Sequence, residues 1–303
     1  MNDPTPQSPH QGCTGDHLPG PLGVGRPVHL PGRGTTVVWD VAGPVGAPTV
    51  VLLHGWTATA QLNWSASVAG LAAHFRVVAL DHRGHGHGIR SAGTFSLAEC
   101  ADDVAALVRA WGVGPVVVVG YSMGGPIAQL VWRRHPDLVA GAVLCSTADV
   151  FAVSARDRRM FGVLDGLAAA ARVGSLRHGV ERVLRGLAAA KARTRAPGAR
   201  ALEQIARHDW FAVLEAGRAL GRHDARSWLG RLDGPSAVVV TTADEVVPAD
   251  RQRAMARRLT DATVHEVDGG HAACFDPASF GVAVVAACRS VAGRARRCHA
   301  IAA

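Results

Sequence analysis

The 303-residue sequence predicts a doubly wound α/β fold with a mostly parallel sheet and an inserted helical cap. Short β-branched runs alternate with helical patterns, and the runs 50–53 and 116–119 are apolar at every position. Strands that are apolar on both faces are typical of a parallel sheet covered by helices on both sides. The alternation stops near Thr147 and returns near Ser236, so a helical insertion is expected between them.

The expected elements follow from this alternation. Five strands are expected before the insertion, at 35–41, 49–53, 75–81, 116–120 and 139–145, with helices at 62–74, 97–111 and 123–135. Strands at 236–242 and 263–267 and helices at 248–259 and 280–291 are expected after it. Within the insertion, helix ends are expected at Gly174, at Pro197-Gly198 and at Gly221. The core domain is therefore expected to comprise residues 35–146 and 234–292, and the cap residues 147–233.

Neither terminus carries an apolar run. Residues 1–34 are rich in Pro, Gly and His and are expected to form a disordered arm without a signal peptide, whereas residues 293–303 are expected to form a basic tail. The sequence contains no run of about 18 apolar residues that would predict a membrane helix. Its six cysteines are scattered, which suggests neither a disulfide framework nor a zinc site. The simplest expectation is a cytoplasmic protein.

The net charge of +8 is concentrated in the insertion, where residues 147–235 hold 16 Arg and Lys against 9 Asp and Glu. Charge alone would permit a nucleic-acid partner. No nucleic-acid motif is present. We therefore expect a solvated helical surface and neither a nucleic-acid nor a membrane partner.

The motif Gly120-Tyr121-Ser122-Met123-Gly124-Gly125 is the strongest chemical signal. It follows a run of four valines and opens an apolar helical pattern, which is the strand–turn–helix context of a nucleophile elbow. Glycines on both sides of the serine provide the space that such a sharp turn requires. The following helix would direct its positive N-terminal end at Ser122 and at an oxyanion formed there.

A second motif, His54-Gly55-Trp56, directly follows a buried strand. The backbone N–H groups of Trp56 and Met123 are expected to form the oxyanion hole. His54 would orient this loop by a hydrogen bond, rather than act as a base.

The general base and its acid partner are expected on later loops. His271 follows the last strand on a glycine-rich loop, and the order serine, acid, histidine suits this fold class. Asp244 follows the preceding strand and is the expected acid. Two alternatives remain open: Glu245 is adjacent, and Asp149 follows an earlier strand.

The histidine-rich segment 81–87 and three aromatic residues can be explained without a functional site. The segment Asp81-His82-Arg83-Gly84-His85-Gly86-His87 could suggest a metal site, but no second ligand cluster accompanies it. We therefore expect a stiff loop and no metal. Candidates for lining the substrate pocket are Trp56, Tyr121 and Trp64, although core packing explains such aromatic residues equally well.

Together these motifs resemble the α/β-hydrolase superfamily, and more narrowly its capped esterase, lactonase and cofactor-free haloperoxidase-like group. The resemblance spans about residues 35–292 and rests on His54-Gly55-Trp56, on the segment from Asp81 to Gly86, on the Ser122 elbow, on Asp244 with Val247-Pro248, and on Gly270-His271. It implies a catalytic triad of Ser122, Asp244 and His271. Epoxide hydrolases and haloalkane dehalogenases carry aspartate at the elbow, so Ser122 argues against their mechanism.

The expected function is hydrolysis of a small carboxylic ester through an acyl-enzyme, without a cofactor. A lactonase, a thioesterase or a perhydrolase would use the same residues. An alternative of another class is a small-molecule receptor that retains the triad, because a fold does not determine a function. The expected partner is a small ester or lactone, and the sequence does not predict the oligomeric state.

Overall fold

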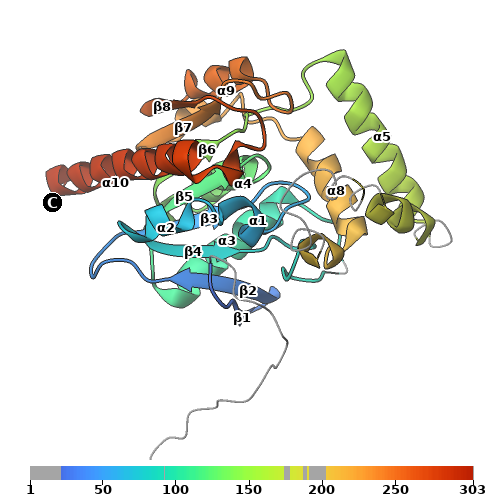
Figure 1. Cartoon of the computed structure of the whole chain (residues 1–303), viewed down its shortest axis with the longest axis horizontal. Helices are drawn as coiled ribbons and strands as arrows, with labels where there is room; N and C mark the ends of the chain where they lie inside the picture. The colour runs from blue at the N-terminus through green and yellow to red at the C-terminus, as the bar shows by residue number, and fades with distance from the viewer. Residues whose placement is uncertain (1–21, 92, 174–177, 187–189, 191–202, 303) are drawn as a thin grey trace, which may run out of the picture.

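The computed structural model describes residues 22–91, 93–173, 178–186, 190 and 203–302. Within this part of the chain, eight strands form one sheet in the order β1-β2-β4-β3-β5-β6-β7-β8 (Figure 1). Pairing is parallel from β4 through β8, whereas β2 runs antiparallel to β4 and β1 antiparallel to β2. The predicted fold class is confirmed.

Apart from β1, which was not predicted, the strands of the sheet are close to the predicted ones. Their bounds are Arg26–Leu30 for β1, Gly34–Val41 for β2, Thr49–Leu53 for β3, Arg76–Leu80 for β4, Val116–Tyr121 for β5, Val139–Cys145 for β6, Ser236–Thr241 for β7 and Ala262–Val267 for β8.

The helices cover both faces of the sheet and extend into the insertion. Their bounds are Ala60–Trp64 for α1, Val68–Ala72 for α2, Leu97–Trp111 for α3, Gly124–Arg134 for α4, Ala155–Ala171 for α5, Trp210–Gly221 for α8, Ala249–Ala256 for α9 and Val282–Ala302 for α10. Single turns lie at Pro136–Leu138, Leu229–Arg231, Ala273–Phe275 and Pro277–Gly281.

Three expectations about the elements were wrong. The arm expected through residue 34 ends earlier, because Arg26–Leu30 form β1 and pair with β2; residues 1–21 lie outside the described part. The single helix expected at 62–74 is divided into α1, with Ser65 as its C-cap, and α2, with Ser67 as its N-cap. The tail expected from residue 293 is the continuation of α10.

Side chains of the central strands alternate between two cores. On β3, Val51 and Leu53 belong to the core that contains residues of α3, α4 and α9. Val50 and Leu52 belong to the core that contains residues of α2 and α10. Successive residues of a strand point to opposite faces, so an uninterrupted apolar run supplies both cores at once.

The insertion between β6 and β7 docks on loops at the carboxyl ends of the parallel strands. The backbone N–H of Asp209 donates to Gly84 O at 2.9 Å, and the N–H of Phe95 donates to Glu215 Oε2 at 2.8 Å. Helix α8 therefore lies against the core, and α5 packs on its outer side (Figure 1). Helix α8 ends at Gly221, as predicted, whereas Gly174, Pro197 and Gly198 lie outside the described residues.

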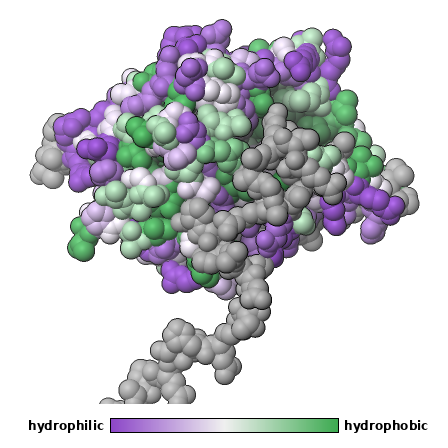
Figure 2. Space-filling view, in the orientation of Figure 1, coloured by the Kyte–Doolittle hydropathy of each residue, from purple (hydrophilic) through white to green (hydrophobic). Residues whose placement is uncertain are grey.

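The outward face of α5 is partly apolar. Met160, Val163 and Leu167 are exposed there, and Figure 2 shows hydrophobic residues beside hydrophilic ones on the side of the molecule where α5 lies. Among the described helices, none combines the length and apolar character needed to cross a membrane.

Candidate active site

Ser122 lies at the sharp turn between β5 and α4, with a φ of 51° in the left-handed region. An ideal Cβ on Gly120 would lie 2.2 Å from Gly124 O, and one on Gly124 would lie 2.1 Å from Leu53 O. Side chains at these two positions would collide with backbone, which explains the motif glycines. Non-glycine residues seldom adopt a positive φ, and such a conformation persists only where neighbouring contacts hold it. Here the Ser122 N–H donates to Cys145 O at 3.0 Å.

The structure brings Ser122, His271 and Asp244 together from three separate loops. His271 Nε2 lies 3.0 Å from Ser122 Oγ, and His271 Nδ1 lies 2.8 Å from Asp244 Oδ2. These loops follow β5, β8 and β7, whose carboxyl ends share one edge of the sheet. Ser122 is 7% exposed and the Asp244 side chain is fully buried, so the row of three hydrogen-bonded side chains extends from near the surface into the protein.

Asp244 is fixed by several donors. The N–H groups of Val246 and Val247 donate to its Oδ1 at 2.8 and 2.9 Å, and the Thr241 hydroxyl donates to its Oδ2 at 2.8 Å. Burial alone would raise the pKa of Asp244, but the hydrogen bond and charge of His271, together with these donors, hold that pKa below its ordinary value. The carboxylate is therefore ionised at neutral pH and faces the imidazole.

The two alternative acids lie elsewhere. Asp149 Oδ2 is 3.0 Å from Nη1 of Arg258, and burial raises the pKa of Asp149. Glu245 is exposed to solvent. Of the three candidates, Asp244 is the one that contacts His271.

The loop after β3 lies against the nucleophile. His54 Nδ1 is 2.8 Å from Gly55 O, and His54 Nε2 accepts the backbone N–H of His82 at 2.9 Å, so this histidine orients the loop. An ideal Cβ on Gly55 would lie 3.2 Å from Ser122 Cβ. The peptide of Trp56 therefore begins beside Ser122, as does that of Met123.

The aromatic candidates have different environments. The Tyr121 hydroxyl donates to His271 O, which ties the β5 turn to the histidine loop. Trp64 is fully buried with its ring beside that of Tyr121, so the structure gives it a packing position in the core. Trp56 is partly exposed, and its indole N–H donates to Val213 O of α8 at 2.7 Å.

Asn63 is a residue of this site that the sequence did not reveal. Its Oδ1 accepts the N–H of Gly55 at 2.6 Å, and its Nδ2 lies 3.6 Å from Sγ of Cys274 on the histidine loop. A buried Asn in a short helix has no local pattern that marks it as a bridge between two loops.

His82 and His85 of the 81–87 loop are buried, and His85 lies beside His208 of the insertion. The ring of His54 lies 4.3 Å from that of His82 and 5.3 Å from that of His85, and His85 lies 5.3 Å from His208 (centroid distances). Burial, and secondarily neighbouring histidines, lowers the pKa of His54 and of His82 to about 3. The described residues contain no group of three His, Cys, Asp or Glu arranged to hold a metal ion.

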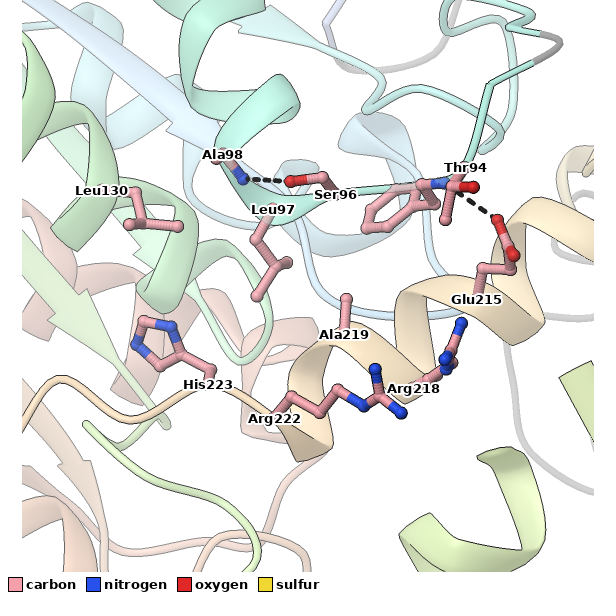
Figure 3. A pocket seen from close by; sticks show the side chains of 11 residues that line it. Thr94, Ser96, Leu97, Ala98, Leu130, Glu215, Arg218, Ala219, Arg222 and His223 are labelled. Atoms are coloured by element: carbon pink, nitrogen blue, oxygen red, sulfur yellow. Dashed lines mark hydrogen bonds between the residues drawn. The ribbon is translucent and has the colours of Figure 1, made fainter. Parts of the chain in front are cut away.

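A separate cavity of about 330 Å³ lies between the start of α3 and α8 (Figure 3). Its charged lining residues are paired: Arg218 and Arg222 both contact Asp165, and Glu215 Oε1 lies 2.7 Å from Nη2 of Arg172. Ser122, Asp244 and His271 do not line this cavity.

Comparison with known proteins agrees with this architecture. Residues 48–278 match the family model described as alpha/beta hydrolase fold, and the chain belongs to this family of hydrolases. It is 32% identical over 225 residues to a pimeloyl-[acyl-carrier protein] methyl ester esterase from Chromobacterium violaceum, a match covering 72% of this chain and 85% of that protein.

Two further matches extend the comparison. The chain is 40% identical over 115 residues to a bifunctional esterase/perhydrolase from Acinetobacter calcoaceticus, which covers 37% of this chain and only 41% of that relative. The solved structure of a hydrolase from Pseudomonas aeruginosa is similar in fold, with a TM-score of 0.72 at 22% identity, covering 89% of this chain and 98% of that one.

Proposed function

We propose that the protein is a serine hydrolase that cleaves small carboxylic esters through an acyl-enzyme intermediate. The observation that carries the proposal is the position of His271, whose two ring nitrogens lie 3.0 Å from Ser122 Oγ and 2.8 Å from Asp244 Oδ2. A nucleophile, a base and a group that orients the base, each within hydrogen-bond distance of the next, form the arrangement that activates a serine.

In this mechanism Ser122 Oγ attacks the ester carbonyl while His271 Nε2 takes the hydroxyl proton. The ionised Asp244 holds the imidazole in the tautomer that leaves Nε2 free to accept, and it stabilises the imidazolium that forms. The N–H groups of Trp56 and Met123 bind the oxyanion of the tetrahedral intermediate. His271 then protonates the leaving alcohol, and water activated by the same imidazole releases the acid.

The substrate class is supported by the relatives' names and by the insertion. The two relatives described above are an esterase/perhydrolase and a methyl ester esterase. The insertion would act as a cap, because it docks on the loops after β3 and β4, and the loop after β3 lies beside Ser122. Such a cap restricts substrate size and excludes water from the reacting centre. Lactones and thioesters would be attacked by the same residues.

The decisive experiment compares the wild-type protein with Ser122→Ala on p-nitrophenyl acetate, followed by a panel of esters, lactones and thioesters. We expect normal folding and a loss of turnover on the order of a million-fold for Ser122→Ala, as for another serine hydrolase that lost its nucleophile. Residual turnover within tenfold of wild type would refute the role of Ser122. A preference for lactones or thioesters in the panel would replace the ester as the substrate class.

A further inference from the structure

The side chain of Trp56 connects the loop beside the nucleophile to the insertion. Its indole N–H donates to Val213 O at 2.7 Å, although the two residues are 157 positions apart in the sequence. Val213 lies in the first turn of α8, and in a regular helix its carbonyl also accepts the N–H of residue 217. The indole therefore adds a second hydrogen bond to a carbonyl that already takes part in the hydrogen bonding of α8.

Gly217 provides the space into which this indole fits. An ideal Cβ on Gly217 would lie 2.5 Å from Cζ2 and 3.0 Å from Cε2 of Trp56. Glycine in a helix interior is less favourable than alanine by about 1 kcal/mol, so an interior glycine calls for a packing reason. Here the nearest neighbour is the Trp56 ring, which occupies the position that a methyl group would need, and Cδ1 of Leu164 on α5 lies 3.0 Å from the same position.

The backbone of the same loop is held from the opposite side. The N–H of Gly55 donates to Asn63 Oδ1 at 2.6 Å, which fixes the peptide immediately before that of Trp56 to the core. Thr57, directly after it, has a φ of 60°, so the loop turns sharply there. Trp56 thus directly follows a residue that is hydrogen-bonded to the core, and its own indole contacts α8.

We propose that α8 positions the oxyanion hole: the Val213 carbonyl and the Gly217 gap fix the Trp56 side chain, and thereby the Trp56 N–H that faces the substrate oxyanion. This inference rests on the proposed function. It makes Gly217 and Val213 positioning residues and gives the insertion a part in transition-state binding as well as in substrate selection. Docking of α8 and assembly of the oxyanion hole become one event.

The expected size of the effect follows from how strictly such donors must be placed. Loss of one oxyanion donor costs about a hundredfold to a thousandfold in turnover. A displacement of about 1 Å costs up to about a hundredfold. Loss of the indole contact leaves the Trp56 N–H present but less well placed, so the smaller range applies.

The test uses two variants that break the contact from opposite sides. Trp56→Phe removes the indole N–H and keeps an aromatic ring, whereas Gly217→Ala fills the gap in α8. Gly166→Ala is the matched control, because an ideal Cβ on this glycine of α5 has nothing within 4 Å. The measurements are kcat and KM for p-nitrophenyl acetate, inhibition by phenylboronic acid and the thermal unfolding midpoint. The tetrahedral boronate on Ser122 places an oxygen in the oxyanion hole.

We expect Trp56→Phe and Gly217→Ala each to lower kcat by about tenfold to a hundredfold with little change in KM. Boronate binding should weaken by a similar factor, and Gly166→Ala should match wild type in all three measurements. The double variant should lose no more than the worse single variant, because both changes act on one contact.

Three results would overturn the proposal. One is wild-type kcat in Trp56→Phe. Another is additive loss in the double variant, which would mean that the two residues act separately. A third is a rise in KM at constant kcat, which would assign the contact to substrate binding. If one single variant fails to fold, the other decides. Ser122→Ala separates this failure from that of the proposed function: ester turnover that survives Ser122→Ala refutes the function itself.

Discussion

His271 Nδ1 lies 2.8 Å from Asp244 Oδ2, whereas Asp149 pairs with Arg258 at 3.0 Å and Glu245 faces solvent. We therefore predict that Asp244→Asn lowers kcat by about ten-thousand-fold, because the amide cannot hold the productive tautomer or stabilise the imidazolium. Asp149→Asn and Glu245→Gln are the controls and should stay near wild type. Steady-state kinetics on a simple ester measures all three, and a large loss confined to either control would assign the acid to that residue.

Asn63 is predicted to affect both stability and rate. Asn63→Leu removes the acceptor of the buried Gly55 N–H, which should lower the free energy of unfolding by about 1 to 3 kcal/mol. It should also lower kcat, since the loop that carries Trp56 loses its attachment to the core. Asn63→Asp keeps an acceptor oxygen and should recover part of the rate. Urea unfolding and ester kinetics test this prediction, and unchanged kcat in Asn63→Leu would show that the loop does not depend on this bond.

The buried histidines predict a loss of stability in mild acid. Burial lowers the pKa of His54 and His82 to about 3 and that of His208 to about 4, from ordinary values near 6.5. Between these values the unfolded chain binds protons that the folded chain does not. The free energy of unfolding therefore falls as pH decreases below about 6.5, by about 1.4 kcal/mol per pH unit for each such histidine.

Urea unfolding between pH 7.5 and pH 5 measures this slope. His208→Asn should reduce it by about one histidine's share, because the side-chain amide oxygen can still accept the Gly86 N–H that now donates to Nδ1 at 2.9 Å. A slope identical in wild type and His208→Asn would mean that His208 takes up its proton in the folded state. The carboxylates with lowered pKa values change their protonation at lower pH, so they contribute little to the slope between pH 7.5 and pH 5.

A buried ion pair between Arg83 and Asp103 is predicted to be essential for folding. Arg83 Nε and Nη2 donate to the two oxygens of Asp103 at 2.8 and 2.7 Å, and both side chains are less than a tenth exposed. Asp103→Asn should cost about 3 to 5 kcal/mol, because it removes the charge that Arg83 and Arg33 share and leaves the buried Arg83 guanidinium with only the more distant Glu99, at 3.4 Å, as an acidic partner.

The adjacent Asp102 provides the control for this change. Its pair with Arg134 lies nearer the surface, so Asp102→Asn should cost about 1 kcal/mol or less. Denaturant midpoints of the two variants give the comparison. Equal losses would indicate that the existing pair of Arg83 with Glu99, at 3.4 Å, compensates for the loss of Asp103.

Local sequence patterns were sufficient for the central strands and for the positions of Ser122, Asp244 and His271. Strands β3 and β6 have their predicted bounds because a continuous run of apolar residues identifies a buried strand. Strand β1 was missed because it is an edge strand, and RPVHL contains a proline and two polar residues. The contacts of Asn63 with Gly55 and of Trp56 with Val213 depend on how separate elements dock. No local spacing encodes such contacts.

The insertion leaves β6 and returns to β7, and these two strands are hydrogen-bonded neighbours, with Cys145 opposite Val239. Because the two strands are parallel, the chain leaves β6 at one edge of the sheet and enters β7 at the other. The base of the insertion is closed instead where the Ala225 N–H donates to Asp149 O at 2.8 Å and Val150 pairs with Asp224, so the segment from α5 to α8 projects from two neighbouring stretches of chain. A segment of different length can be exchanged at this point with two local junctions to fit. The exchange is limited by the loop that carries Trp56, because the new segment must also provide a carbonyl that accepts the Trp56 indole N–H and a space for its ring.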